Sequence, residues 1–114
     1  MASSALVPQN VIPGGMAETF EACNVDGNYF LNSSAKFFIH VKNTNASQKT
    51  VHIDAPGQCS QGFNHDADVV IPATNGDKLI GPFDVSRFND SSNYVQLTYT
   101  EGITDLTIAL LKLG

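Results

Sequence analysis

The 114-residue sequence predicts a single all-β domain: a compact antiparallel β-sandwich of about eight strands, jelly-roll-like or closed into a small barrel. A chain of this length has room for one hydrophobic core. Short segments rich in β-branched and aromatic residues alternate with clusters of Gly, Pro, Asn, Asp and Ser at intervals of roughly 8 to 12 residues. No stretch of the sequence carries the i, i+3, i+4, i+7 apolar spacing of an amphipathic helix.

The expected strands are each bounded by turn residues. Among these turns, Asn75-Gly76 is the strongest signal for a tight reversal. In chain order the strands are expected at Glu18–Cys23, Asn28–Leu31, Lys36–Lys42, Lys49–Asp54, Asp66–Ile71, Lys78–Ile80, Tyr94–Thr100 and Asp105–Leu113.

Two pairs of consecutive segments are interpreted as neighbouring strands. Apolar residues alternate in 36–42 and in 49–54, on either side of the polar stretch 43–48, which predicts a hairpin. The segments 94–100 and 105–113 flank a Gly-containing turn and are interpreted as a second pair. Residues 105–113 form a compact apolar run, and their β-branched residues favour a strand over a helix.

Residues 1–16 lack both the helical and the alternating pattern, and they contain two prolines and a Gly-Gly pair. We interpret them as an extended N-terminal arm that precedes the sandwich domain, residues 17–114. A terminus of this kind either frays in solvent or orders on a neighbouring molecule. Four apolar side chains favour a binding role, because a solvated tail does not require them: Leu6, Val7, Val11 and Ile12.

The charge balance argues against two classes of partner. The formal net charge is -5, from 11 acidic and 6 basic residues, and the pI is about 4.8. An acidic surface repels a phosphate backbone and an anionic bilayer, so neither nucleic acid nor a membrane is an expected partner. The N-terminus has no signal-peptide pattern, so we expect synthesis in the cytosol, where Cys23 and Cys59 are expected as buried thiols, with a disulfide as the alternative.

The three histidines are candidates for metal ligands. His40 and His52 would be cross-strand neighbours on the outer face of the predicted hairpin, and His65 precedes Asp66 and Asp68. The calcium-loop pattern is missing, since its glycine and its distal glutamate are absent. The sequence therefore predicts surface pairs and turn caps here, with no metal and no cofactor.

Catalytic motifs are likewise absent from the sequence. The serines lie in Ser/Asn-rich stretches without a G-x-S-x-G motif, and the surroundings of Cys59 match no catalytic cysteine pattern. The pair Gly14-Gly15 precedes no strand-to-helix turn, so it does not form a phosphate-binding loop. We predict that the protein is not an enzyme.

Two aromatic residues are candidates for anchoring a partner. Phe38 lies on the mainly polar face of its strand, and Tyr94 shares a face with Gln96 and Thr98. Each either packs beneath a loop or the second sheet, or is buried only when a partner binds. With the four apolar residues of the arm, they complete the expected partner-binding set.

Three stretches of the sequence carry a resemblance to a known family. They are FIHVKN at 38–43, QGFNHD at 61–66 running on to VVIPA at 69–73, and LIGPF at 79–83 followed by RFND at 87–90. In order and spacing they resemble small capsid-associated proteins of tailed bacteriophages. The resemblance covers roughly residues 36–100.

This resemblance implies a decoration or cement protein on the outside of the phage head, commonly a homotrimer, that holds major capsid subunits together. The chain would then be made in the host cytoplasm and become part of the virion, at the capsid surface. A neck- or tail-associated virion protein is an alternative. A carbohydrate-binding β-sandwich is another, because its aromatic contacts could come from Tyr29, Tyr94 and Tyr99.

Overall fold

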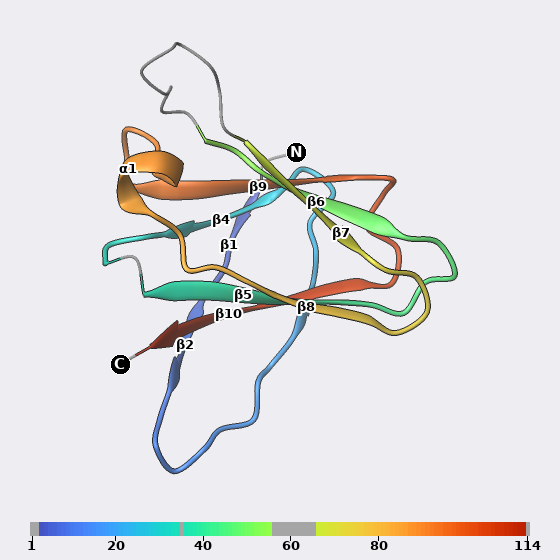
Figure 1. Cartoon of the computed structure of the whole chain (residues 1–114), viewed down its shortest axis with the longest axis horizontal. Coiled ribbons are helices and arrows are strands. Elements are labelled where there is room, and N and C mark those ends of the chain that lie inside the picture. Colours follow the sequence, from blue (N-terminus) through green and yellow to red (C-terminus); the bar gives the residue numbers. More distant parts are fainter. Residues whose placement is uncertain (1–2, 35, 56–65, 114) are drawn as a thin grey trace.

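The computed structural model describes residues 3–34, 36–55 and 66–113, which form two β-sheets packed face to face (Figure 1). Sheet A has the strand order β1 (Ser4–Ala5), β4 (Asn28–Leu31), β9 (Tyr94–Thr100), β6 (Lys49–Ile53) and β7 (Ala67–Ile71). Sheet B has the order β2 (Pro8–Val11), β10 (Leu106–Leu113), β5 (Phe37–Asn43) and β8 (Gly76–Ile80), with β3 (Glu21–Ala22) also paired to β10. A single helical turn, α1 (Val85–Phe88), precedes β9.

The strand order is that of a jelly roll. Four neighbouring strands of sheet A, in the order β4-β9-β6-β7, face four strands of sheet B, in the order β3-β10-β5-β8. Within each set of four, all hydrogen-bonded neighbours are antiparallel. From β3 onward the chain changes sheet at each connection except the hairpin between β6 and β7. The predicted β-sandwich is confirmed, and the jelly roll is the form that it takes.

Both predicted neighbouring pairs are wrong. The strands β5 and β6 lie in opposite sheets, and so do β9 and β10. Alternation in the sequence indicates which side chains face the core, but it does not indicate which strand lies alongside. The amide of Asn43, at the end of β5, lies 3.0 Å from the Ser47 carbonyl and 3.1 Å from the Pro72 carbonyl, and it thereby holds the crossover to β6.

The N-terminal segment differs from the expected free arm. Strand β1 pairs in parallel with β4, and β2 pairs in parallel with β10, so residues 4–11 run along the edges of both sheets. These two parallel pairs also depart from the purely antiparallel sandwich that was expected. Between the strands, the Leu6 amide donates to the Tyr29 carbonyl at 2.8 Å, and the Leu6 side chain is only 5% exposed. The segment is ordered by its own domain because β4 and β10 offer it backbone partners and the core accepts Leu6.

The core lies between the sheets. Its aromatic centre is a chain of phenylalanine rings: Phe30 is 5.9 Å from Phe37 and 5.4 Å from Phe83, which is 5.6 Å from Phe88. Alternate residues of β5, β6, β9 and β10 complete it, namely Ile39, Val41, Val51, Ile53, Val95, Leu97, Leu106, Ile108 and Leu110.

The side chains of Asn32 and Asn89 join two distant segments of the chain. The buried Asn32 side chain donates to the Asn89 side chain at 2.9 Å, and the Asn89 side chain donates to the Asn32 carbonyl at 2.7 Å. This exchange ties the end of β4 to the segment that follows α1. The free thiol of Cys23 is buried, and Cys59 lies outside the described residues.

Candidate functional site: an apolar groove on sheet B

The outer face of sheet B carries apolar side chains from three strands. Antiparallel partners share a face, and Phe38 is paired with Leu111, while His40 is paired with Leu79. Because Ile39 and Val41 point into the core, Phe38 and His40 point away from it. The expectation that Phe38 lies on the outer face of its strand is therefore correct.

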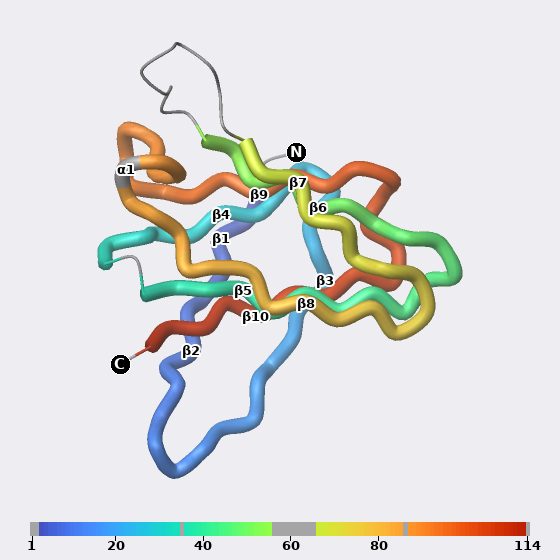
Figure 2. The backbone as a smooth tube through the Cα atoms, in the orientation of Figure 1, coloured from blue at the N-terminus to red at the C-terminus, as the bar shows by residue number. Residues whose placement is uncertain are grey.

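A loop lies over part of this face. Residues 12–20, which connect β2 to β3, project from the sandwich on the outer side of sheet B and are called the flap here (Figures 1 and 2). The Gln9 side chain fastens the base of the flap, because it donates to the Thr19 carbonyl and accepts from the Thr19 amide, both at 2.8 Å. Leu111 points outward and is nevertheless buried, since it lies in the same groove as flap residues Ile12 and Met16.

A histidine–carboxylate contact joins the flap to the sheet. The Nδ1 of His40 lies 2.9 Å from both carboxylate oxygens of Glu18 in the flap, and its Nε2 contacts Asp77 of β8. The Phe20 ring packs edge-on against the His40 ring, with 5.1 Å between the ring centroids. The Lys42 ammonium lies over the Phe20 ring, 4.6 Å from the centroid of that ring. The flap therefore has a defined position, set by contacts at its C-terminal end.

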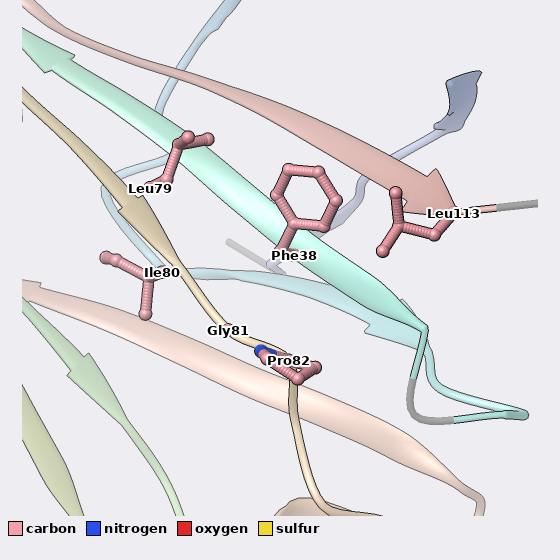
Figure 3. A pocket seen from close by; sticks show the side chains of 6 residues that line it. All are labelled: Phe38, Leu79, Ile80, Gly81, Pro82 and Leu113. Carbon is pink, nitrogen blue, oxygen red and sulfur yellow. The ribbon is translucent and has the colours of Figure 1, made fainter. Parts of the chain in front are cut away.

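Between the flap and β8 runs an apolar groove, called the sheet B groove here. Its wider part encloses about 340 Å³ and its narrower part about 180 Å³, and the two parts share Phe38 and Leu79. Leu79 is 63% exposed. Figure 3 shows the narrower part, in which Phe38 of β5 lies between Leu79 of β8 and Leu113 of β10.

Gly81 shapes the narrower part of the groove. It has a φ of +135°, and a Cβ placed on it would lie 2.7 Å from the Cβ of Phe38. The backbone can pass so close to Phe38 only because this residue has no side chain. The Gly81–Pro82 peptide bond is cis, and both residues line the groove.

The predicted partner-binding residues lie in four different places. Val11, Ile12 and Phe38 come together in the sheet B groove. Val7 is 72% exposed between β1 and β2, away from the residues that line the groove. The prediction for Leu6 is corrected, because its side chain belongs to the core and is not available to a partner.

Tyr94 lies on the other sheet. Its strand, β9, is in sheet A, and its ring packs edge-on against Tyr29 at 5.0 Å. The groove residues that sequence reasoning missed include Met16, Leu79, Leu111 and Leu113. An alternation count on 105–113 could have assigned Leu111 and Leu113 to the face opposite Ile108 and Leu110, but nothing in the sequence places β8 beside β5.

The second histidine cluster lies on sheet A, so His40 and His52 are not the cross-strand neighbours that a hairpin would have made them. His52 pairs with Asp68 across β6 and β7, and its Nδ1 lies 2.6 Å from an Asp68 carboxylate oxygen. That hydrogen bond raises the pKa of His52 above its usual value, although partial burial acts in the opposite direction. Burial also raises the pKa of Asp54, and the nearby charge of Asp66 adds to the rise. His65 lies outside the described residues.

The Cys23 thiol lies within the core. Burial raises its pKa to about 12, so it remains protonated at neutral pH and is not an activated nucleophile.

The Tyr99 hydroxyl, whose pKa burial also raises, donates to the Asn28 side chain at 2.6 Å. Tyr99 is therefore a structural residue and not part of an exposed aromatic surface.

In the described parts of the chain, no helix has the length and apolar character needed to cross a bilayer. Comparison of the sequence with protein-family models and with curated proteins, and of the structure with solved structures, finds no match in any of the three.

Proposed function

We propose that this chain is a structural protein of a phage virion, without catalytic activity, that binds the outer surface of the head and stabilises the contacts between major capsid subunits. The observation that carries the proposal is the sheet B groove, where Phe38 and two residues of the N-terminal segment form one apolar surface. The resemblance of residues 36–100 to capsid-associated phage proteins supplies the partner.

An exposed apolar groove with a defined shape is suited to protein binding. Contiguous apolar surface is costly to leave in water, and it commonly marks an interaction site on a soluble domain. Leu79 is mostly exposed and Phe38 lies beside it at the centre of the groove, so a partner side chain would cover both. Burial of one such side chain contributes about 1.5 to 3 kcal/mol.

Binding of this kind would stabilise a shell through linkage. A protein that binds the assembled shell and not its separate subunits lowers the free energy of the shell by its own binding free energy. The effect is repeated at every copy, so a modest affinity per copy is sufficient. We include in the proposal the homotrimer that the resemblance implies; light scattering should give about three times the 12.2 kDa chain mass, and a monomer at micromolar concentration would contradict it.

The carbohydrate-binding alternative is favoured by one observation, the Tyr29–Tyr94 pair on the outer face of sheet A. Lectin domains also use jelly rolls. However, Tyr99 does not join the pair, because its hydroxyl is bound to Asn28. Binding on a glycan array that disappears in Tyr94→Ala would support this alternative, and a blank array would contradict it.

Cryo-electron microscopy of the phage particle that contains this protein tests the head location. We expect jelly-roll density on the outside of the head, with the sheet B groove against the major capsid subunits. Density confined to the neck or tail would contradict the head location and favour the neck or tail alternative. A purified particle without this chain would contradict virion membership altogether.

A further inference from the structure

The two histidines on the outer faces differ in how the surrounding carboxylates are arranged. At His40 the two carboxylates contact opposite ring nitrogens, Glu18 at Nδ1 and Asp77 at Nε2. Opposite ring nitrogens point away from each other, so these carboxylates cannot share one ion with the histidine. At His52, Asp68 contacts Nδ1 and Asp66 lies 3.3 Å from Nε2, and Asp54 offers a third carboxylate oxygen close to both His52 and Asp66.

Beside His52 there are therefore three potential ligand atoms. One oxygen each from Asp54 and Asp66, together with a His52 ring nitrogen, lie within 4.8 Å of one another. The distance from His52 Nε2 to Asp66 Oδ2 is 3.3 Å, which is longer than the usual N–H···O distance of about 2.9 Å. Two ligands about 2.1 Å from a tetrahedral zinc ion are about 3.4 Å apart, so this pair already has the spacing of metal ligands.

Groups outside the cluster orient two of the three ligands, His52 and Asp66. His52 Nδ1 donates to Asp68 at 2.6 Å, which leaves Nε2 on the side of Asp66, 3.3 Å from its Oδ2. This is the carboxylate–histidine arrangement that commonly supports a metal-bound imidazole. The backbone amide of Ala55 donates to Asp66 Oδ1 at 2.7 Å, which leaves Oδ2 on the side of His52. These two contacts use His52 Nδ1 and Asp66 Oδ1, so His52 Nε2 and Asp66 Oδ2 are the atoms that would bind an ion.

We propose that His52, Asp54 and Asp66 form a binding site for a divalent first-row transition-metal ion such as Zn²⁺. A mixed set of one imidazole and two carboxylates suits such an ion better than Mg²⁺ or Ca²⁺, which prefer oxygen ligands alone. With Asp68, three carboxylates face one histidine, so the cluster is anionic, and a divalent ion would neutralise it.

The ion would act on the stability of sheet A. Asp54 follows the last residue of β6 and Asp66 precedes the first residue of β7, so one ion would join the two strands where the chain leaves the sheet and returns to it. Binding to the folded state alone would raise the midpoint of thermal unfolding. The site is on the sheet opposite the groove, so it is independent of the proposed capsid function.

Isothermal titration calorimetry of the full chain with ZnCl₂ tests the site, with matched Asp→Asn variants. We expect one Zn²⁺ per chain with a Kd below about 100 μM, and at least a tenfold weaker Kd in Asp54→Asn. The control, Asp77→Asn, removes a carboxylate beside the other histidine and should bind Zn²⁺ as the unmodified chain does. No saturable binding up to about 1 mM, or equal affinity in the unmodified chain and Asp54→Asn, would overturn the proposal.

Nitrogen NMR of the histidine rings gives a readout that does not depend on any variant. Zn²⁺ should shift the Nε2 resonance of His52, while Nδ1 stays protonated toward Asp68. A zinc-dependent shift at His40 with none at His52 would contradict the proposed site, even if calorimetry shows binding.

Discussion

The outer faces of the two sheets have the same architecture and opposite chemistry. Sheet B presents the apolar groove, and its charged side chains collect at one end, around His40. On sheet A the outward positions of β6, β7 and β9 are mostly polar, with His52 paired to Asp68 and to Thr98. Because both faces lie on one core, the difference between them comes from the outward residues of the strands and, on sheet B, also from the flap.

This difference supports the proposal that a protein partner binds through sheet B. A partner that requires apolar contact would meet it on sheet B, whereas sheet A is better suited to solvent and ions. Exposed apolar residues do occur on sheet A, and Leu31 is 52% exposed, but Leu31 does not line the groove. Leu31 therefore provides a natural control for Leu79.

The largest loss of stability is expected from a change in the core that lies between the two sheets. Phe30 packs between Phe37 of sheet B and Phe83, and it is almost fully buried. Phe30→Ala should lower the free energy of unfolding by about 3 to 5 kcal/mol, because it leaves a cavity between the sheets. Urea unfolding followed by circular dichroism measures the change; a loss below about 1 kcal/mol would show that the ring cluster does not hold the sheets together.

A change at Gly81 should affect sheet B selectively. In Gly81→Ala the new methyl group would meet Phe38 and the Phe37 carbonyl at 2.7 and 3.0 Å, at a φ that L-residues rarely adopt. We expect a loss of roughly 1 to 3 kcal/mol, and NMR shift changes concentrated around the groove. Gly14→Ala is the control, since a Cβ there meets nothing within 4 Å; equal losses in the two variants would contradict this account of Gly81.

The contact between the flap and His40 should give a smaller, local effect. Glu18→Gln keeps the shape of the side chain and removes its charge, so we expect a loss of up to about 1 kcal/mol. Hydrogen exchange of the Thr19 amide, which donates to Gln9, should become faster while amides in β6 and β9 stay unchanged. Unchanged exchange at Thr19 would indicate that Gln9 alone fastens the flap.

The smallest effect is expected at Asp90, just before β9 of sheet A. Hydrogen bonds from the Gln96 side chain first, and from the Tyr94 and Ser92 amides, lower the pKa of Asp90. A lowered folded-state pKa gives stability that is present above the unfolded value of about 3.9 and lost as pH falls through the folded value.

Asp90 is close to solvent, so its contribution should stay below about 1 kcal/mol. The unmodified chain should exceed Asp90→Asn in unfolding free energy at pH 6, and the difference should shrink by pH 2.5. A difference that is constant across this range would contradict the assignment to the Asp90 charge.

Strand positions were accessible from the sequence, but strand neighbours were not. The bounds of β4 and β9 agree with the expected segments, because alternation and turn residues are local signals. The jelly-roll pairing of β5 with β8 and β10 depends on contacts between distant segments, which no local pattern encodes. The short β1 and β2 were missed because two or four residues beside prolines carry no readable alternation.

The groove was only partly predictable for the same reason. Phe38, Val11 and Ile12 could be selected as apolar residues outside the expected core, but their convergence depends on the flap and on the pairing of β5 with β8. The cluster around His52 was not predicted, because the expected hairpin placed His52 beside His40. The true partner strand, β7, brings Asp68 opposite His52.

Binding of paired variants to phage heads that lack this protein tests the central claim most directly. Leu79→Asp places a charge in the sheet B groove, and Leu31→Asp places the same charge at a similarly exposed position on sheet A. We predict at least a tenfold loss of affinity, about 1.4 kcal/mol, for Leu79→Asp and less than a twofold change for Leu31→Asp. Equal losses in both variants, or a larger loss in Leu31→Asp, would contradict binding through sheet B.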